Sequence, residues 1–561
     1  MADDLWRWNA VRLAHAIRTR LVSSKEAVAA CLARLEAINP RVNAVVETLA
    51  EEALEAAERA DRELAKGSPT GPLHGVPVTT KINTDQQGCA TTNGVAAFAS
   101  LIADEDSPSI ANLRRAGAIV IGRTNAPEFS WRWFTDNELY GETVNPWDRQ
   151  RTCGGSSGGA AVAVATGMCP LAQGTDFGGS IRHPALCCAI AGLRPSLGRV
   201  PAYNATTGDR PITAQFMAVH GPLARKVSDL RLALAAMAVG DVRDPWWVPA
   251  PLAGSAPARP IRVALVDGAR RPGLDAGIAD ALGQAATWLR DAGYVVEDAA
   301  APSIEEASQL WSTLVLNEAK LAMISQISQY GGAAIRKTGE LMVAQAPPAD
   351  FASFLKALGR RATVLREWQL FFERYPLILM PVCREPAFQL GLDQEDGAAM
   401  KRIFDAVAPM LAPAVLGLPG VAVPTGVRNN VPLGVQLVAG PFREDLCLDA
   451  AEKIESRAGV LTPIDPSKTI QHPGYLVLLT RSAIARTSMA AAKASKMPTT
   501  QASLVLSAWR SMSMNHSSTL TAAMAAIEPS SFCFKSEKPI LTSPSGQSGC
   551  FAGSMRARKF S

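Results

Sequence analysis

The 561-residue sequence lacks the usual markers of membrane, secreted and metal-binding proteins. No apolar run approaches the ~18 residues that a bilayer span needs. The N-terminus, Met1-Ala2-Asp3-Asp4, has neither the basic region nor the apolar stretch of a signal peptide. The ten cysteines form no CxxC pair and show no zinc spacing, so we expect reduced thiols in the core. We therefore predict a cytoplasmic protein that contacts no membrane and needs no metal and no cofactor.

Most of the chain also lacks an excess of positive charge. The formal net charge is +5, but residues 471–561 alone contain 10 basic and 2 acidic side chains. The remaining residues, 1–470, contain 46 basic and 49 acidic side chains. A mildly acidic surface does not suit the phosphate backbone of a nucleic acid. We predict no nucleic-acid partner.

The composition changes after Pro466. Beyond that residue the sequence is rich in Ser, Ala and Thr, poor in acidic residues and only weakly periodic. Such a composition buries too little apolar surface to offset the entropy lost on ordering. We predict one large domain over residues 1–466 and a low-complexity, basic, disordered tail over residues 467–561. The Pro-, Ala- and Gly-rich segment 245–260 is interpreted as a surface connection inside the domain.

Helix-like and strand-like segments alternate along the predicted domain. Ser23 and Glu26 form a capping box at the start of one helix, which Asn39-Pro40 is expected to end. Further helices are predicted at 107–115, 160–172, 226–238 and 276–292, with an Ala/Glu-rich helix ending near Lys66, and strands at 43–48, 72–81, 118–121, 261–266 and 434–439. This alternation favours an α/β fold with a central sheet covered by helices on both faces.

Two glycine-rich turns, each with a serine, are the most informative motif of the sequence. The first turn, Cys153–Gly159, contains Ser156, and the second, Gly174–Arg182, contains Ser180 twenty-four residues later. Glycine permits a positive φ and a close approach of other groups, so such turns can direct several N–H groups at one point. The pattern indicates a backbone shaped around a small reacting group.

Ser180 is the candidate nucleophile. The three residues before it can present successive backbone N–H groups to a developing oxyanion, and each such donor is typically worth ~10²–10³ in rate. These candidate donors are Phe177, Gly178 and Gly179. Serine also needs a base, and histidine is scarce. The histidines of the predicted domain show no aspartate pairing like that of a hydrolase triad; they are His15, His74, His183 and His220.

Lys81 can act as the base if it is neutral. It ends an apolar, strand-like segment, and burial can lower a lysine pKa by the roughly 3 units required. Neutral Lys81 would take a proton from Ser156, and Ser156 from Ser180. The reverse path would protonate a leaving amine, a contribution of ~10²–10⁴ in rate. Taken singly, Lys81 also fits a surface lysine and each serine a turn residue, so the interpretation depends on the three together.

These motifs together resemble the amidase signature family. Its hallmark is a serine-rich glycine loop, a second Gly-Gly-Ser loop and an upstream lysine. Further blocks like those of the family occur at 71–77, 122–128, 145–148, 192–195, 221–225, 417–420 and 432–437. The resemblance covers about residues 5–466, so the predicted domain would be an amidase domain. It implies a mixed, twisted central sheet and hydrolysis of a carboxylic acid amide to the acid and ammonia or an amine.

By this resemblance, Ser180 is the serine that becomes acylated, Ser156 is the bridging serine after a cis peptide bond, and Lys81 is the base. The resemblance also implies that Asp176 and Arg182 brace the second glycine-rich turn, Gly174–Arg182, which we call the nucleophile loop.

Ser157 would support the proton relay from the same glycine loop. Two positions depart from the family pattern, namely Ile82, where an acidic residue is usual, and His183, where an apolar or small residue is common. Neither departure removes a catalytic group, and both are expected to reshape the pocket.

The substrate pocket is less well defined. Trp131, Trp133 and Phe134 lie near a family block that borders the active cleft. They would line an apolar acyl pocket together with His183, or they would pack in the core, and both interpretations stay open. We predict a small-molecule amide as the partner. Its identity is not determined, and neither is the choice between a monomer and a homodimer.

Two other functions are considered. One is the A-type amidotransferase subunit that releases ammonia from glutamine. That subgroup tends to have a Ser-Leu-Asp-Gln-Ile-Gly-Pro run where this chain has Phe216–Pro222, so a free-standing amidase is favoured. The other is a non-catalytic binding protein on an amidase scaffold, and the presence of Lys81, Ser156 and Ser180 argues against it.

Overall fold

The structure, a computed structural model, describes residues 2–266 and 273–466. The predicted tail over residues 467–561 lies outside the described residues. Eleven strands form one sheet in the order β1-β3-β2-β4-β6-β5-β10-β11-β9-β7-β8. The strands are β1 Val45–Thr48, β2 Pro77–Lys81, β3 Ile119–Thr124, β4 Leu171–Asp176, β5 Ala191–Arg194, β6 Val219–Ala224, β7 Arg262–Leu265, β8 Val295–Asp298, β9 Leu377–Pro381, β10 Gly420–Arg428 and β11 Val431–Ala439.

Helices connect most of these strands. The α-helices are α1 Ala10–Arg18, α2 Ser24–Val42, α3 Ala50–Ala65, α4 Pro108–Arg115, α5 Gly158–Ala165, α6 Arg182–Cys187, α7 Ile212–Met217, α8 Val227–Met237, α9 Ala276–Asp291, α10 Ile304–Leu321, α11 Met323–Tyr330, α12 Ala333–Ala344, α13 Phe351–Arg374, α14 Gly397–Leu416 and α15 Glu444–Ala458. Short 3₁₀ turns lie at η1 Ala2–Arg7, η2 Ala96–Phe98, η3 Glu128–Ser130 and η4 Leu392–Gln394. None of the helices in the described ranges combines the length and apolar character that crossing a membrane would require.

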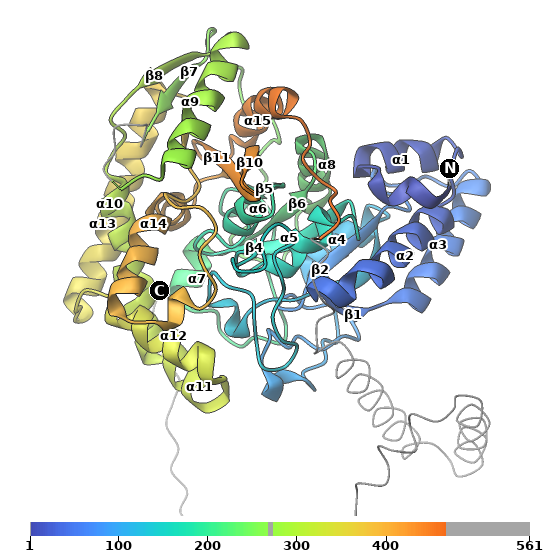
Figure 1. Cartoon of the computed structure of the whole chain (residues 1–561), viewed down its shortest axis with the longest axis horizontal. Helices are drawn as coiled ribbons and strands as arrows, with labels where there is room; N and C mark the ends of the chain where they lie inside the picture. The colour runs from blue at the N-terminus through green and yellow to red at the C-terminus, as the bar shows by residue number, and fades with distance from the viewer. Residues whose placement is uncertain (1, 267–272, 467–561) are drawn as a thin grey trace, which may run out of the picture. The chain divides into compact units, whose positions relative to one another are not determined.

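The sheet is mixed, as the resemblance implied. Strand β2 pairs in parallel with both β3 and β4, whereas β4 pairs antiparallel with β6. Strands β10 and β11 form an antiparallel hairpin that continues the sheet toward β9. Figure 1 shows β7 and β8 at one end of the sheet and β1 and β2 toward the other. The parallel centre brings the carboxyl ends of β2 and β4 to the same edge, where Lys81 and Asp176 end their strands.

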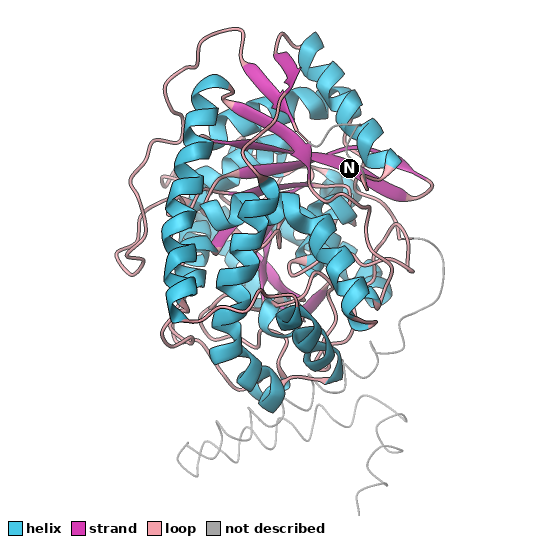
Figure 2. Ribbon diagram, turned by 90° about the vertical axis from the view of Figure 1, so that its left-hand side faces the viewer, coloured by secondary structure: helices cyan, strands magenta, loops and turns pink. Residues whose placement is uncertain are grey.

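Two hydrophobic cores lie on the two faces of the sheet. In β3, Ile119 and Ile121 belong to one core and Val120 to the other, because successive side chains of a strand point to opposite faces. Buried residues of α2, α5, α6, α10 and α14 fill the first core. Buried residues of α1, α8, α9 and α15 fill the second. Helices therefore cover both faces, as predicted, and Figure 2 shows several of them packed along the strands.

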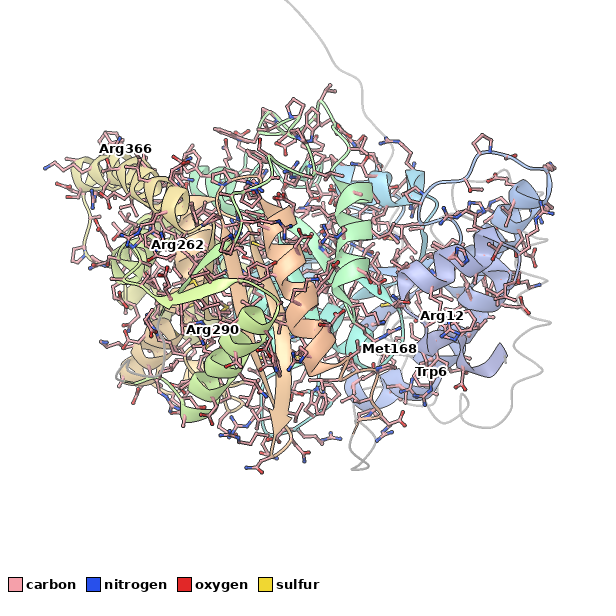
Figure 3. The ribbon with its side chains drawn as sticks, turned by 90° about the horizontal axis from the view of Figure 1, so that it is seen from above. Trp6, Arg12, Met168, Arg262, Arg290 and Arg366 are labelled. Carbon is pink, nitrogen blue, oxygen red and sulfur yellow. The ribbon has the colours of Figure 1, made fainter. Side chains whose placement is uncertain are left out.

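The two ends of the sheet are built from distant parts of the chain. Seen from above in Figure 3, Trp6 and Arg12 lie at the N-terminal end, and Arg262 and Arg290 lie at the opposite end. Lys81 ends β2 and Ser180 follows β4, which are the third and fourth strands in the sheet order, and Ser156 lies between β3 and α5. This placement buries the candidate site under helices from both halves of the chain.

The capping box of α2 is confirmed, because Ser23 Oγ accepts from the Glu26 N–H at 3.1 Å and the Glu26 carboxylate accepts from the Ser23 N–H at 2.7 Å. The predicted end of this helix at Asn39-Pro40 is wrong. Helix α2 continues to Val42 with Pro40 inside it. The helix ends instead at Asn43, which adopts φ +51°, and the buried Asn39 side chain caps this end: it accepts from the N–H groups of Ala44 and Val45 and donates to the Val45 carbonyl.

The helix predicted at 160–172 is also too long. Helix α5 ends at Ala165, and β4 begins at Leu171. Gly167 adopts φ +81°, a left-handed conformation that ends the helix and turns the chain into the strand. The predicted surface connection at 245–260 contains neither helix nor strand, as expected.

Candidate active site

Lys81 is fully buried at the end of β2. Its Nζ lies 2.7 Å from Ser156 Oγ and donates to Thr175 Oγ1 at 3.0 Å. Thr175 is near because β4, which contains it, is the parallel neighbour of β2. Burial lowers the pKa of Lys81 to about 7, although the charge of Asp176 opposes the shift. This agrees with the fall predicted from the sequence, and it makes a neutral amine available near neutral pH.

The first glycine loop presses Ser156 against Lys81. The peptide bond between Gly155 and Ser156 is cis, as the resemblance implied. A Cβ on Gly155 would lie 2.5 Å from the Arg132 carbonyl oxygen, so the loop requires glycine there for close packing. Ser156 is buried directly before α5, which begins at Gly158.

Ser157 connects the two glycine loops. Its N–H donates to the Ser180 carbonyl at 3.1 Å, and its hydroxyl donates to the Thr175 carbonyl at 3.3 Å. These contacts agree with the supporting role predicted for Ser157, which stays a prediction. They hold the serine of each loop in the same part of the site.

Ser180 lies just before α6 and is 8% exposed, so it is nearly buried. Gly179 before it adopts φ +102°, a conformation that favours glycine, and a Cβ there would lie 2.5 Å from Met410 Sδ. Within residues 2–266 and 273–466, no hydrogen bond joins the hydroxyls of Ser156 and Ser180. The proton transfer between them stays a prediction, since catalytic hydrogen bonds often tighten only when substrate binds.

The candidate oxyanion donors differ in their availability. The Gly179 N–H donates to Asp176 Oδ1 at 2.9 Å, so it is already engaged. No described group accepts a hydrogen bond from the N–H groups of Phe177 or Gly178. The Ser180 N–H, which was not among the predicted donors, likewise has no acceptor in the described part of the chain. The loop thus presents unpaired donors next to the candidate nucleophile.

Asp176 anchors the nucleophile loop through two arginines. Arg182 donates to its carboxylate at 3.0 and 3.1 Å, and Arg194 Nη1 donates to it at 3.1 Å. The Asp176 carboxylate also accepts from the N–H groups of Gly179 and Ile181. Burial alone would raise the pKa of Asp176, yet the two guanidinium groups hold it well below its usual range. The bracing predicted for Asp176 and Arg182 is consistent with these contacts.

The four tentative pocket residues separate into two places. The rings of Trp131 and Phe177 lie 6.4 Å apart, and Trp133 Nε1 donates to the Gly178 carbonyl at 2.9 Å. Phe134 instead stacks on Phe388, at 6.1 Å between ring centroids.

His183 is fully buried, 5.6 Å from the ring of Phe388 and 3.6 Å from Cys187 Sγ. Burial lowers its pKa to about 3, so its imidazole is neutral. This placement favours packing over substrate contact for Phe134 and His183.

Two aromatic residues beside the nucleophile loop were missed from the sequence. Trp311 of α10 donates to the Phe177 carbonyl at 3.0 Å, and its ring lies 5.8 Å from that of Phe177. Phe404 of α14 meets Trp133 edge to face at 5.5 Å. We call the set of Trp131, Trp133, Phe177, Trp311 and Phe404 the aromatic wall. Only the fold unites them, because the last two are more than a hundred residues away in sequence and carry no local motif.

The described residues contain no group of three or more His, Cys, Asp or Glu side chains that could hold a metal ion. The expected absence of a metal and a cofactor stays a prediction. Among the histidines, His220 contacts Ser109 Oγ at 2.8 Å and His74 contacts the Ala60 carbonyl at 3.1 Å. Neither contact involves the candidate catalytic serines.

Comparison with known proteins gives concordant results. Residues 26–448 match the protein family described as Amidase. The chain is 46% identical over 459 residues to an indoleacetamide hydrolase of Bradyrhizobium diazoefficiens strain USDA 110, and the match covers 82% of this chain and 88% of that relative. It is 32% identical to the A-type subunit of a glutamyl-tRNA(Gln) amidotransferase of Moorella thermoacetica, and this match covers 81% of this chain and 97% of the relative.

Solved structures agree with these relatives. A bacterial aryl acylamidase of the amidase signature family superposes with a TM-score of 0.69 at 25% identity, covering 82% of this chain and 99% of that chain. The family match contains β2 and both glycine loops, which together hold the buried lysine and the two serines. The amidotransferase protein is the more distant of the two relatives, and a non-catalytic scaffold finds no support among them. The chain therefore belongs to the amidase family, and it is an enzyme that hydrolyses amide bonds.

Proposed function

We propose that this amidase hydrolyses the primary amide of a small arylacetic acid to the acid and ammonia, with indoleacetamide among its substrates. The 46% identity to an indoleacetamide hydrolase supports this substrate class. The observation that carries the proposal is the aromatic wall next to the Gly178–Ser180 turn. An aryl ring packed on Trp131 and Phe177 would leave the amide one methylene away, within reach of Ser180.

Acylation would begin with neutral Lys81. Its amine takes the proton of the Ser156 hydroxyl, and Ser156 takes that of Ser180 as the Ser180 oxygen attacks the amide carbon. The carbonyl oxygen becomes an oxyanion, which accepts hydrogen bonds from the N–H groups of Phe177 and Gly178, for which the described residues offer no other acceptor. The 2.7 Å contact between Lys81 and Ser156 supports the first transfer.

Collapse of the tetrahedral intermediate breaks the C–N bond. The proton held by Lys81 returns through Ser156 to the leaving nitrogen, which departs as ammonia and leaves an ester on Ser180. Water then attacks this ester, and the same relay accepts its proton. The C–O bond to Ser180 breaks, the relay returns the proton to the Ser180 oxygen, and the acid is released. Because one amine accepts and returns the proton, a pKa near 7 suits both directions at neutral pH.

Ammonia release from a panel of amides would test the substrate class. Indoleacetamide and phenylacetamide should be hydrolysed with a higher kcat/KM than acetamide or glutamine, and Ser180→Ala should abolish release from each of them. Fluorophosphonate labelling, followed by peptide mass spectrometry, should place the adduct on Ser180. A preference for glutamine would favour the amidotransferase function instead, and an unlabelled Ser180 would refute the proposed nucleophile.

The bounds of the domain, the cellular location and the oligomeric state are further parts of this proposal. We assign the amidase domain to residues 1–466, because the family match lies within it and Arg34 donates to Asp465 at 2.7 Å near its end. A chain ending at residue 466 should then retain the activity of the whole chain. A cytoplasmic location and a homodimer stay predictions, which cell fractionation and light scattering would test.

A further inference from the structure

Three consecutive carbonyl groups of the nucleophile loop each accept a hydrogen bond from a buried side chain. Arg194 Nη1 donates to the Asp176 carbonyl at 2.8 Å. Trp311 Nε1 donates to the Phe177 carbonyl at 3.0 Å, and Trp133 Nε1 donates to the Gly178 carbonyl at 2.9 Å. The donors come from β5, from α10 and from the segment after η3. Three distant parts of the fold thus converge on one turn.

A trans peptide is planar, and its C=O and N–H point in opposite directions. A donor that holds the carbonyl of one residue therefore fixes the direction of the next residue's N–H. Arg194 sets the direction of the Phe177 N–H, Trp311 that of the Gly178 N–H, and Trp133 that of the Gly179 N–H. The first two of these N–H groups have no acceptor among the described residues and face the side opposite their anchors.

We propose that Trp311 and Trp133 are positioning residues that orient the oxyanion donors of this amidase through the carbonyl side of the loop. The inference rests on the proposed function of the Ser180 loop. Two glycines in sequence would otherwise leave these peptide planes free to rotate. The Trp311 ring also packs closely on the loop, since a Cβ on Gly178 would lie 3.0 Å from Trp311 Cζ2. A hydrogen bond to a carbonyl additionally polarises its peptide and strengthens the N–H as a donor.

The two tryptophans do not act equally. The peptide between Gly178 and Gly179 is held at both ends, by Trp133 at its carbonyl and by Asp176 at its N–H. The peptide between Phe177 and Gly178 is held by Trp311 at its carbonyl, and its N–H is unpaired in the described structure. Loss of the Trp311 indole N–H should therefore disturb the oxyanion site more than loss of the Trp133 N–H.

Tryptophan-to-phenylalanine substitutions remove the N–H and keep an aromatic ring. Trp311→Phe should lower kcat about 10- to 100-fold, and Trp133→Phe should lower it less. The matched control is Trp368→Phe in α13, because Trp368 is fully buried and its Nε1 has no partner in the described residues. This control should retain wild-type kcat, so any general cost of replacing a buried indole is measured separately.

The decisive readout is the second-order rate of fluorophosphonate labelling at Ser180, since the phosphoryl oxygen occupies the oxyanion site during labelling. The labelling rate of Trp311→Phe should fall in parallel with its kcat, whereas binding of phenylacetate as a product inhibitor should change less than about threefold. Unchanged kcat in Trp311→Phe, or a lower kcat with an unchanged labelling rate, would overturn the inference.

The labelling readout does not depend on the proposed substrate. If wild-type enzyme is labelled at Ser180 but hydrolyses no arylacetamide, the substrate assignment fails, and the labelling rates of the variants still test the positioning role. If wild-type Ser180 is not labelled at all, the proposed nucleophile and the positioning role both fail.

Discussion

Lys81 and Asp176 are buried equally deeply in the same site, yet their surroundings differ in electrostatic character. Lys81 has two hydroxyls within hydrogen-bonding distance and no carboxylate contact among the described residues, so burial lowers its pKa to about 7. Asp176 is surrounded by Arg182, Arg194 and two backbone N–H groups, which keep it ionised. Among the described residues, the candidate base Lys81 has no carboxylate as counter-ion, whereas the Asp176 carboxylate is fully paired.

Replacing Lys81, which contacts no carboxylate among the described residues, should have the largest effect on activity. Lys81→Met keeps the length and apolar stem of the side chain but removes the proton acceptor. We expect kcat to fall about 10³-fold or more. Steady-state ammonia release would measure this, with Lys25→Met, an exposed lysine paired with Glu58, as a control of wild-type activity. A Lys81→Met enzyme within tenfold of wild type would contradict the role of the amine.

Replacing Asp176, whose carboxylate is paired with two arginines, should mainly lower stability. Asp176→Asn leaves Arg182 and Arg194 buried without their carboxylate, and we expect the free energy of unfolding to fall by about 3–5 kcal/mol. Urea unfolding would measure the loss. Asp4→Asn, which breaks an exposed pair with Arg7, should change stability by less than about 0.5 kcal/mol. Equal effects of the two substitutions would show that burial does not decide the difference.

The pKa of Lys81 predicts how stability depends on pH. Its folded value, about 7, lies below the ordinary 10.5, so between these values the unfolded chain binds more protons than the folded one. Stability should therefore rise with pH across that window. Burying the lysine amine costs at most about 4 kcal/mol of folding free energy at pH 7, and Lys81→Met removes this cost. The substitution also loses the hydrogen bonds to Ser156 and Thr175, which reduces the gain in stability. The variant should exceed the wild-type stability at pH 7, and its advantage should shrink toward pH 10.

The smallest predicted effect is the pH profile of the wild-type enzyme. The relay needs neutral Lys81, so kcat/KM should fall about tenfold per pH unit below the Lys81 pKa of about 7 and level off above it. Initial rates measured between pH 5 and 9 would show this acidic limb, in which kcat/KM falls as the pH is lowered. A limb centred near 4 would indicate a carboxylate base instead and would remove the contrast between Lys81 and Asp176.

Much of the site was predictable, because its chemistry is concentrated in short motifs. Residue type and spacing indicate Lys81, Ser156 and Ser180, and the apolar neighbours of Lys81 indicate its lowered pKa. The α/β class, the mixed sheet and the capping box of α2 were also predictable. By contrast, the predicted end of α2 was wrong, because the helix ends where Asn43 adopts a left-handed φ of +51° and where the Asn39 carboxamide binds the backbone of Ala44 and Val45.

The aromatic residues that pack beside the nucleophile loop from distant helices were not predictable. Trp311 and Phe404 lie on largely buried helices, where aromatic positions look like ordinary core residues in sequence. Trp131, Trp133 and Phe134 are close together in sequence, yet two of them face the nucleophile loop and the third stacks on Phe388. Their directions depend on backbone turns near η3, where Phe129 and Ser130 adopt positive φ.

The candidate catalytic groups and the glycines next to them follow from the sequence alone, because both lie within segments of a few residues. Only the tertiary structure shows which N–H groups of the described chain lack an acceptor, which carbonyls accept a hydrogen bond from a side chain, and which charged side chains have an ion-pair partner. These properties depend on contacts between β5, α10 and the loop of Ser180, which the chain brings together only when the sheet forms. A hydrogen bond needs partners about 3 Å apart, and separation along the sequence does not report that distance.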